Sequence, residues 1–236
     1  IIGFIAGGDS EIRGCTNNGV LDNEHYNNNN WTNGGTSGSI GGIIGAYGYK
    51  MTIAGTIKIA DCVNTATVRS KRGMSGGIAG YLREGEIKGC NNSGSMAQGE
   101  RSFIGGIAAV VENTAVSGCT ALCNIGGMSA GSETYNGGGV VGILGTGSSV
   151  ADCAYFGDIV CNSDKTNNAG EAQAAGLIVA NPYEGTTVSG CKAGGKIPVP
   201  VLSTGTSTVV TADNVANFIV GNANVTPTGC TYWDGK

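Results

Sequence analysis

The sequence predicts an all-β protein, a single-stranded parallel β-helix or β-solenoid of about seven irregular coils. Two observations predict it: glycine accounts for 44 of the 236 residues, and seven copies of one short phrase end in cysteine. Glycine inside a helix costs about 0.5–1 kcal/mol per site, which excludes a helical bundle. Glycine follows no strict three-residue period, so the chain is not a collagen. Short apolar runs recur along the whole chain, which argues against a disordered polypeptide.

The first phrase of the repeat is a short apolar strand, in most copies preceded by small residues. Its β-branched bias and its length of three to five residues are typical of a strand. One such unit buries too little apolar surface to be stable alone, so the copies are expected to stack. The copies read I-G-F-I-A (2–6), G-G-I-I-G (41–45), G-G-I-A-G (76–80), G-G-I-A-A (105–109), G-G-V-V-G (138–142), A-G-L-I-V (175–179) and N-F-I-V-G (217–221).

The second phrase ends in cysteine. It follows the apolar residue of the first phrase by 11 to 14 residues, except in the second copy, where the spacing is 19. An insertion that contains Tyr47, Tyr49 and Lys50 accounts for the longer spacing. The copies read I-R-G-C (12–15), I-A-D-C (59–62), I-K-G-C (87–90), V-S-G-C (116–119), V-A-D-C (150–153), V-S-G-C (188–191) and P-T-G-C (227–230).

A third phrase follows the cysteine. A small residue stands four positions after each of the first six cysteines, and an apolar residue stands two positions further on. The three phrases together define one coil of a single domain that spans residues 1–236. Parallel stacking of such coils favours a right-handed wind. The coils are expected near residues 2–21, 41–68, 76–96, 105–125, 138–159, 175–197 and 217–232.

Between the third phrase of one coil and the first phrase of the next, the chain varies in length. These insertions are therefore expected to leave the rod along one edge, which is the usual binding surface of a solenoid. Within the last of them and the residues that follow, Thr211 to Asn217 are expected to form one helical turn. The insertions are residues 22–40, 126–137, 160–174 and 198–216.

The combined pattern of glycine pair, apolar residues, cysteine and a following small residue resembles the GLUG repeat. Residues 76–96 and 138–159 carry the resemblance best, and it extends over about residues 2–232. GLUG repeats occur in secreted and surface proteins of bacteria, including regions of immunoglobulin A peptidases outside their catalytic part. The resemblance implies a surface-exposed or secreted bacterial repeat region and brings over no catalytic residue. Glycine or aspartate precedes the cysteine here, where asparagine is expected.

We interpret the recurrent cysteines as a structural ladder of buried thiols. Stacked strand positions point their Cβ atoms in parallel, which is poor geometry for a disulfide, and free cysteine packs as a small apolar residue. The spacing of metal-binding cysteine pairs is absent. Cys123 and Cys161 lie outside the ladder, and a bridge between them is the alternative left open. The ladder consists of Cys15, Cys62, Cys90, Cys119, Cys153, Cys191 and Cys230.

The sequence offers little for catalysis. His25 is the only histidine, so no zinc site of the H-E-x-x-H type is possible. Asp61 and Asp152 share the position before the cysteine but stand three coils apart, roughly 14 Å at the rise between strands. That separation exceeds the roughly 5–9.5 Å of a glycosidase pair. We therefore expect no catalytic residue, no metal and no cofactor.

Aromatic residues in the insertions are the candidates for ligand contact. His25, Tyr26 and Trp31 lie among asparagines in the first insertion, and Tyr47 and Tyr49 lie in the second copy's insertion. Aromatic faces and amides suit sugar rings, although a polar spacer is the alternative. At the other end of the chain, Tyr232 and Trp233 are expected to cap the open edge.

The sequence therefore favours a non-catalytic module for adhesion that contacts a host protein or a glycan. Formal charge is −4 and pI about 5.0, and no basic stripe suggests nucleic-acid binding. No apolar run is long enough to insert into a membrane. The chain is expected to be a monomer, secreted or at the cell surface of a bacterium. A β-helix enzyme that acts on polysaccharides and a purely structural spacer are the alternatives.

Overall fold

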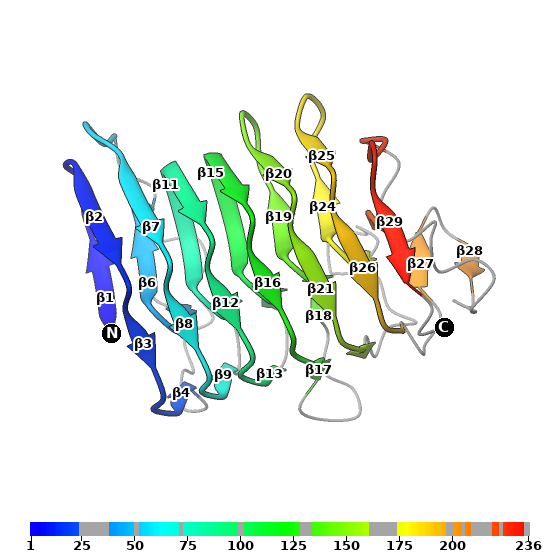
Figure 1. The fold of residues 1–236 in the computed structure, drawn as a ribbon, viewed down its shortest axis with the longest axis horizontal. Helices are drawn as coiled ribbons and strands as arrows, with labels where there is room; N and C mark the ends of the chain where they lie inside the picture. Colours follow the sequence, from blue (N-terminus) through cyan, green and yellow to red (C-terminus); the bar gives the residue numbers. More distant parts are fainter. Residues whose placement is uncertain are drawn as a thin grey trace.

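In the computed structural model, the described part of the chain is entirely β-structure and turns, without a helix. Figure 1 shows the strands side by side along the long axis, from the N-terminus at one end to the C-terminus near the other. All pairings are parallel except one hairpin. This arrangement is compatible with a β-solenoid. The described residues are 1–23, 38–49, 52–70, 73–98, 102–127, 134–160, 174–196, 201–203, 206–208, 219–221 and 224–233.

The largest sheet, sheet A, contains ten strands in two arms. The strands of the first arm follow the glycine pairs, and those of the second arm precede the cysteines. Two strands, β11 and β15, run through both arms. The strands are β1 (Ile2–Ile5), β2 (Ser10–Arg13), β6 (Ile44–Tyr47), β7 (Ile57–Ala60), β11 (Ala79–Lys88), β15 (Ala108–Ser117), β19 (Val141–Leu144), β20 (Ser149–Ala151), β24 (Val179–Pro182) and β25 (Thr187–Ser189).

Sheet B consists of the seven strands that follow the cysteines. Each of the first six cysteines accepts, through its carbonyl oxygen, a hydrogen bond from the residue after the next cysteine of the series. The cysteines of the second phrase therefore form one column along the stack. The strands are β3 (Thr16–Asn17), β8 (Val63–Asn64), β12 (Asn91–Asn92), β16 (Thr120–Ala121), β21 (Ala154–Phe156), β26 (Lys192–Gly194) and β29 (Thr231–Trp233).

Sheet C contains the apolar residues of the third phrase. Its five parallel strands all end where the variable segments of the sequence begin. The described strand ends therefore anchor the variable segments along one edge of the stack. The strands are β4 (Leu21–Asn23), β9 (Val68–Ser70), β13 (Met96–Gln98), β17 (Ile125–Gly127) and β22 (Ile159–Val160).

The strands of sheet D end at the glycine pairs, where the chain turns toward sheet A. Most residues of the variable segments, and the helical turn expected at 211–217, lie outside the described residues. The two strands β27 (Val201–Ser203) and β28 (Thr206–Thr208) form the antiparallel hairpin. The strands of sheet D are β5 (Ser39–Gly41), β10 (Gly73–Gly76), β14 (Ser102–Gly105), β18 (Thr134–Gly138) and β23 (Ala174–Gly176).

The register corrects two phrases of the sequence alignment. Ile2 pairs with Ile44 rather than with Gly41, so the first phrase is displaced by three residues. Gly176, not Ala175, pairs with Gly138, which displaces the sixth phrase by one. Apolar residues next to a small residue fit either register by composition, and the close approach of the backbones decides between them.

The glycine pairs turn the chain sharply between sheets D and A. At Gly77, a Cβ would overlap the carbonyl oxygen of Gly106 in the next repeat, and at Gly76 it would overlap the carbonyl oxygen of Ala79. Neither residue has a positive φ, so glycine is required here for space rather than for backbone conformation.

The position before the cysteine has a different requirement. All seven residues there adopt left-handed backbone, with φ between 52° and 63°. Five are glycine and two are aspartate, residue types that reach this conformation at low cost. The departure from the GLUG pattern at this position is therefore compatible with the turn. The residues are Gly14, Asp61, Gly89, Gly118, Asp152, Gly190 and Gly229.

An asparagine ladder runs through the interior next to the first three cysteines. Asn17 Nδ2 donates to Asn64 Oδ1, and Asn64 Nδ2 donates to Asn92 Oδ1, both at 2.8 Å. Asn92 Nδ2 donates to the carbonyl oxygen of Gly106. Buried amides need such partners, and the stack supplies them from repeat to repeat. In the remaining repeats Ala121, Tyr155, Ala193 and Tyr232 occupy the same column.

Replacing Asn64 with alanine removes the middle member of this ladder. We expect the free energy of unfolding to fall by about 1–3 kcal/mol, because buried partners on both sides lose a hydrogen bond. Urea unfolding measures the change. The control is Asn18→Ala, since Asn18 Oδ1 accepts only an exposed hydrogen bond from Thr65. Equal losses in the two variants would contradict the ladder's role.

Candidate binding surface

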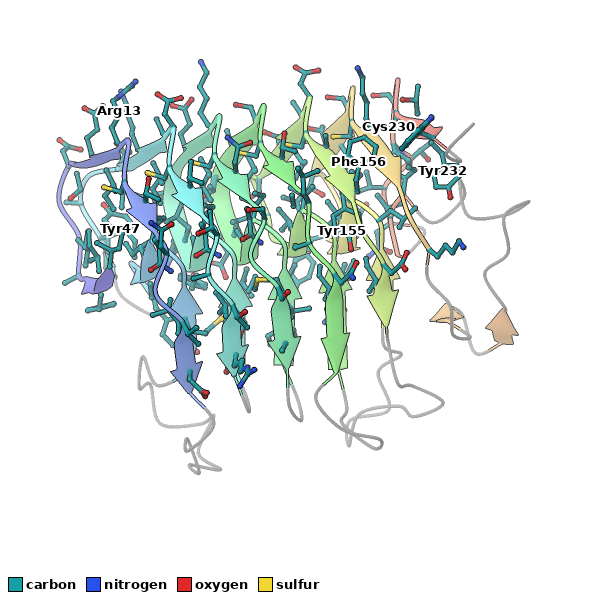
Figure 2. All side chains as sticks on the ribbon, turned by 60° about the horizontal axis from the view of Figure 1, so that its bottom comes forward. Arg13, Tyr47, Tyr155, Phe156, Cys230 and Tyr232 are labelled. Atoms are coloured by element: carbon teal, nitrogen blue, oxygen red, sulfur yellow. The ribbon has the colours of Figure 1, made fainter. Side chains whose placement is uncertain are left out.

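The structure places only some of the predicted contact residues. His25, Tyr26 and Trp31 lie outside the described residues. Tyr47 is fully buried, and its hydroxyl donates to the carbonyl oxygen of Gly8 at 2.8 Å. Burial raises the pKa of Tyr47. The expected ligand contact at Tyr47 is therefore corrected: strand alternation in β6 turns this ring into the core, as Figure 2 shows.

Tyr49 belongs to a second apolar cluster. Its ring meets the ring of Tyr81 edge-on, with centroids 4.9 Å apart. The buried members of this cluster include Met74 and Val110, and they lie apart from the main core. Tyr49 is half-buried there, so its packing against the protein accounts for its position.

The cysteine column contains free thiols. The five inner cysteines are buried, and Cys15 and Cys230 at the two ends are half-buried. Each thiol donates to the carbonyl oxygen two residues before it, at 3.2 to 3.7 Å. Cys123 is also free and buried, and accepts a hydrogen bond from Asn92 Nδ2 at 3.3 Å. Cys161, its suggested partner, lies outside the described residues.

Burial makes the Cys62 and Cys123 thiols poor nucleophiles at neutral pH. It raises the pKa of Cys62 to about 11 and that of Cys123 to about 12. Between neighbours in the column, hydrogen bonding raises the pKa of Cys119 and lowers that of Cys153. A reactive cysteine needs exposure as well as thiolate character, and the five inner sulfurs of the column are buried.

Alkylation of the native protein tests the thiol column. With iodoacetamide, Cys15 and Cys230 are expected to react, while Cys62, Cys90, Cys119, Cys153 and Cys191 stay protected until denaturant is added. Peptide mass spectrometry assigns the modified positions. Reaction of Cys119 as fast as Cys15 in native buffer would contradict the burial of the column.

Two aspartates occupy the position before the cysteine, and glycines separate them along the stack. Between Asp61 and Asp152 stand Gly89 and Gly118, one in each intervening repeat. Asp61 Oδ2 accepts a hydrogen bond from Arg13 Nη1 at 2.8 Å, on the exposed face. The two carboxylates are therefore not brought together as an acid and base pair.

A charged cluster lies where the two arms of sheet A meet. Arg83 Nε is 3.8 Å from Glu112 Oε2 and 4.0 Å from Glu84 Oε1. Asn113 Nδ2 donates to Glu84 Oε1 at 2.8 Å, and both of these residues have left-handed backbone. Tyr81, alongside, is only 4% exposed, and burial together with Glu112 raises its pKa. The cluster therefore lies where two neighbouring strands, β11 and β15, each contain one residue with left-handed backbone.

Within the described residues, no group of three or more histidine, cysteine or acidic side chains is arranged as a metal site. The same part of the chain contains no helix that could span a membrane.

An exposed apolar stripe runs along the outer face of sheet B toward the C-terminal end. Leu122 is 53% exposed and Trp233 57% exposed, and Phe156 lies half-buried between them. The Phe156 and Trp233 rings meet edge-on with centroids 5.9 Å apart. They do so across Gly194, which pairs with both residues and leaves room for the Phe156 ring.

Sequence reasoning missed this stripe. Its members stand three residues after a cysteine. In the first three copies this position holds a polar residue, so the repeat pattern gave no sign of an apolar stripe there. The expected cap at the end of the chain is only half right. Tyr232 turns inward and donates to the carbonyl oxygen of Gly195 at 2.9 Å, whereas the next residue, Trp233, turns outward.

No family model, curated protein or solved structure matches this chain.

Proposed function

We propose that the chain is a right-handed β-solenoid of seven coils that serves as a non-catalytic adhesion module, secreted or at a bacterial surface, and contacts a glycan. The GLUG-like phrases support the location and the general role. The stacked parallel sheets support the rod. The Phe156–Trp233 pair supports the glycan contact.

The exposed indole is the observation that carries the proposal. Large aromatic rings bury much apolar area when they bind, and indole adds a hydrogen-bond donor at its edge. Trp233 presents 57% of its surface on a regular sheet, beside a second ring at 5.9 Å. A sugar ring has a flat apolar face and a rim of hydroxyls, which fits a ring pair of this kind. A pure spacer has no need of exposed aromatic residues.

A glycan array with labelled protein tests the contact. We expect Trp233→Ala to lower binding at least about tenfold, as loss of a central aromatic anchor does. The matched control is Tyr183→Ala, which removes another exposed ring, 46% exposed, from a turn outside the stripe. Equal urea midpoints for both variants establish that folding is unchanged. Absence of glycan binding by the wild type would favour the spacer.

A polysaccharide-acting enzyme is the second candidate, favoured by the meeting of Arg83, Glu84 and Glu112. Both carboxylates are within 4.0 Å of the same guanidinium, and Tyr81 is buried with a raised pKa. The Tyr81 hydroxyl, with its raised pKa, is a poor general base or acid at neutral pH, and the carboxylates face a guanidinium rather than a cleft-bound ligand. Incubation with neutral and uronate-containing polysaccharides is therefore expected to give no new reducing ends. Their release, and its loss in Arg83→Gln, would support the enzyme.

A further inference from the structure

We infer that the ligand at the Phe156–Trp233 pair is an acidic sugar, one that carries a carboxylate or sulfate, and that Lys192 binds its charge. This inference rests on the proposed function, because it specifies the ligand of the same surface.

Lys192 stands beside the ring pair by strand geometry. It lies two residues before Gly194 in β26, so both residues belong to the outer face of sheet B. Gly194 is the position across which the two rings meet. A lysine side chain at this spacing reaches the edge of a ring-sized ligand that rests on Gly194.

The lysine is available for a ligand. Lys192 is exposed, and it makes no ion pair with any residue in the described ranges. On the neighbouring strands, Ala154 and Thr231 pair with Lys192. Their side chains are a methyl group and a hydroxyl-bearing group, and neither carries a charge. An anion placed over Gly194 therefore meets one cation that has no ion-pair partner among the described residues.

Two carboxylates lie at the turns next to β26. Asp158 Oδ1 accepts a hydrogen bond from the backbone N–H of Lys196 at 2.9 Å. Asp152 Oδ1 lies against Gly190, at the turn before the cysteine. The Asp158 carboxylate is thus used by the turn that follows β26, and Lys192 is exposed to solvent.

A flat sheet face with two rings and one cation suits a single sugar residue better than an acidic peptide. A peptide that binds a sheet commonly adds as a strand along an edge. The stripe instead runs from Leu122, just after β16, across the strands β21, β26 and β29 on the outer face of sheet B.

The test compares neutral, carboxylated and sulfated glycans on one array. Wild type is expected to bind the acidic glycans, with affinity that falls as salt concentration rises. Lys192→Gln is expected to lower that affinity about tenfold or more, the usual effect of losing a hydrogen bond to a charged group. Lys192→Arg is expected to keep it, and Lys88→Gln, an exposed lysine on the second arm of sheet A, serves as the matched control.

The outcomes separate the two proposals. Equal binding of neutral and acidic glycans that Lys192→Gln leaves unchanged would overturn the acidic ligand and leave the glycan contact standing. No binding of any glycan would overturn both. Lys192-dependent binding of polyglutamate without binding of acidic glycans would assign the surface to an acidic peptide and overturn the sugar.

Discussion

The close approach of one repeat's backbone to the next is the constraint on which the rest of the structure depends. At Gly77 the carbonyl oxygen of Gly106 occupies the place that a Cβ would need, so the turn between sheets D and A closes only without a side chain. This contact fixes the register of the following strands. Once the register is fixed, like residues must lie on one another, which produces the columns of cysteine and asparagine in the interior.

The two interior columns solve the burial problem by different chemistry. The cysteines are weakly polar, and a thiol tolerates a long hydrogen bond to the carbonyl two residues before it. The asparagines are strongly polar and are stable inside only because each amide reaches the next at 2.8 Å. Stacking at the strand spacing satisfies both, because it repeats one geometry along the rod.

Much of the fold could be predicted from the sequence, because glycine and cysteine recur at positions where few other residue types fit. The recurrence of glycine pairs and of cysteine predicted parallel stacking, and it located the start of the first phrase and the end of the second phrase in most repeats. The predicted register was wrong at Ile2 and Ala175. At both, the residue types fit neighbouring positions equally well, and only the contact between backbones determines the register. Which aromatic residues are exposed was harder to predict. Tyr47 is buried and Trp233 exposed because of strand alternation, and the repeat pattern does not show the alternation next to an insertion or at the last copy.

The asparagine ladder has a direction. Each Nδ2 donates toward the later repeat, and the chain of amides ends when Asn92 donates to the backbone at Gly106. Beyond that point alanine and tyrosine alternate, small against large. The repeats are therefore not exchangeable units. A duplicated repeat with asparagine in this column would extend the amide chain if it were inserted among the first three. Placed between Ala121 and Tyr155, its amide would find no amide on either side and would depend, as Asn92 does, on a glycine carbonyl of the following repeat. The effect of duplicating a repeat therefore depends on the point along the stack at which the copy is inserted.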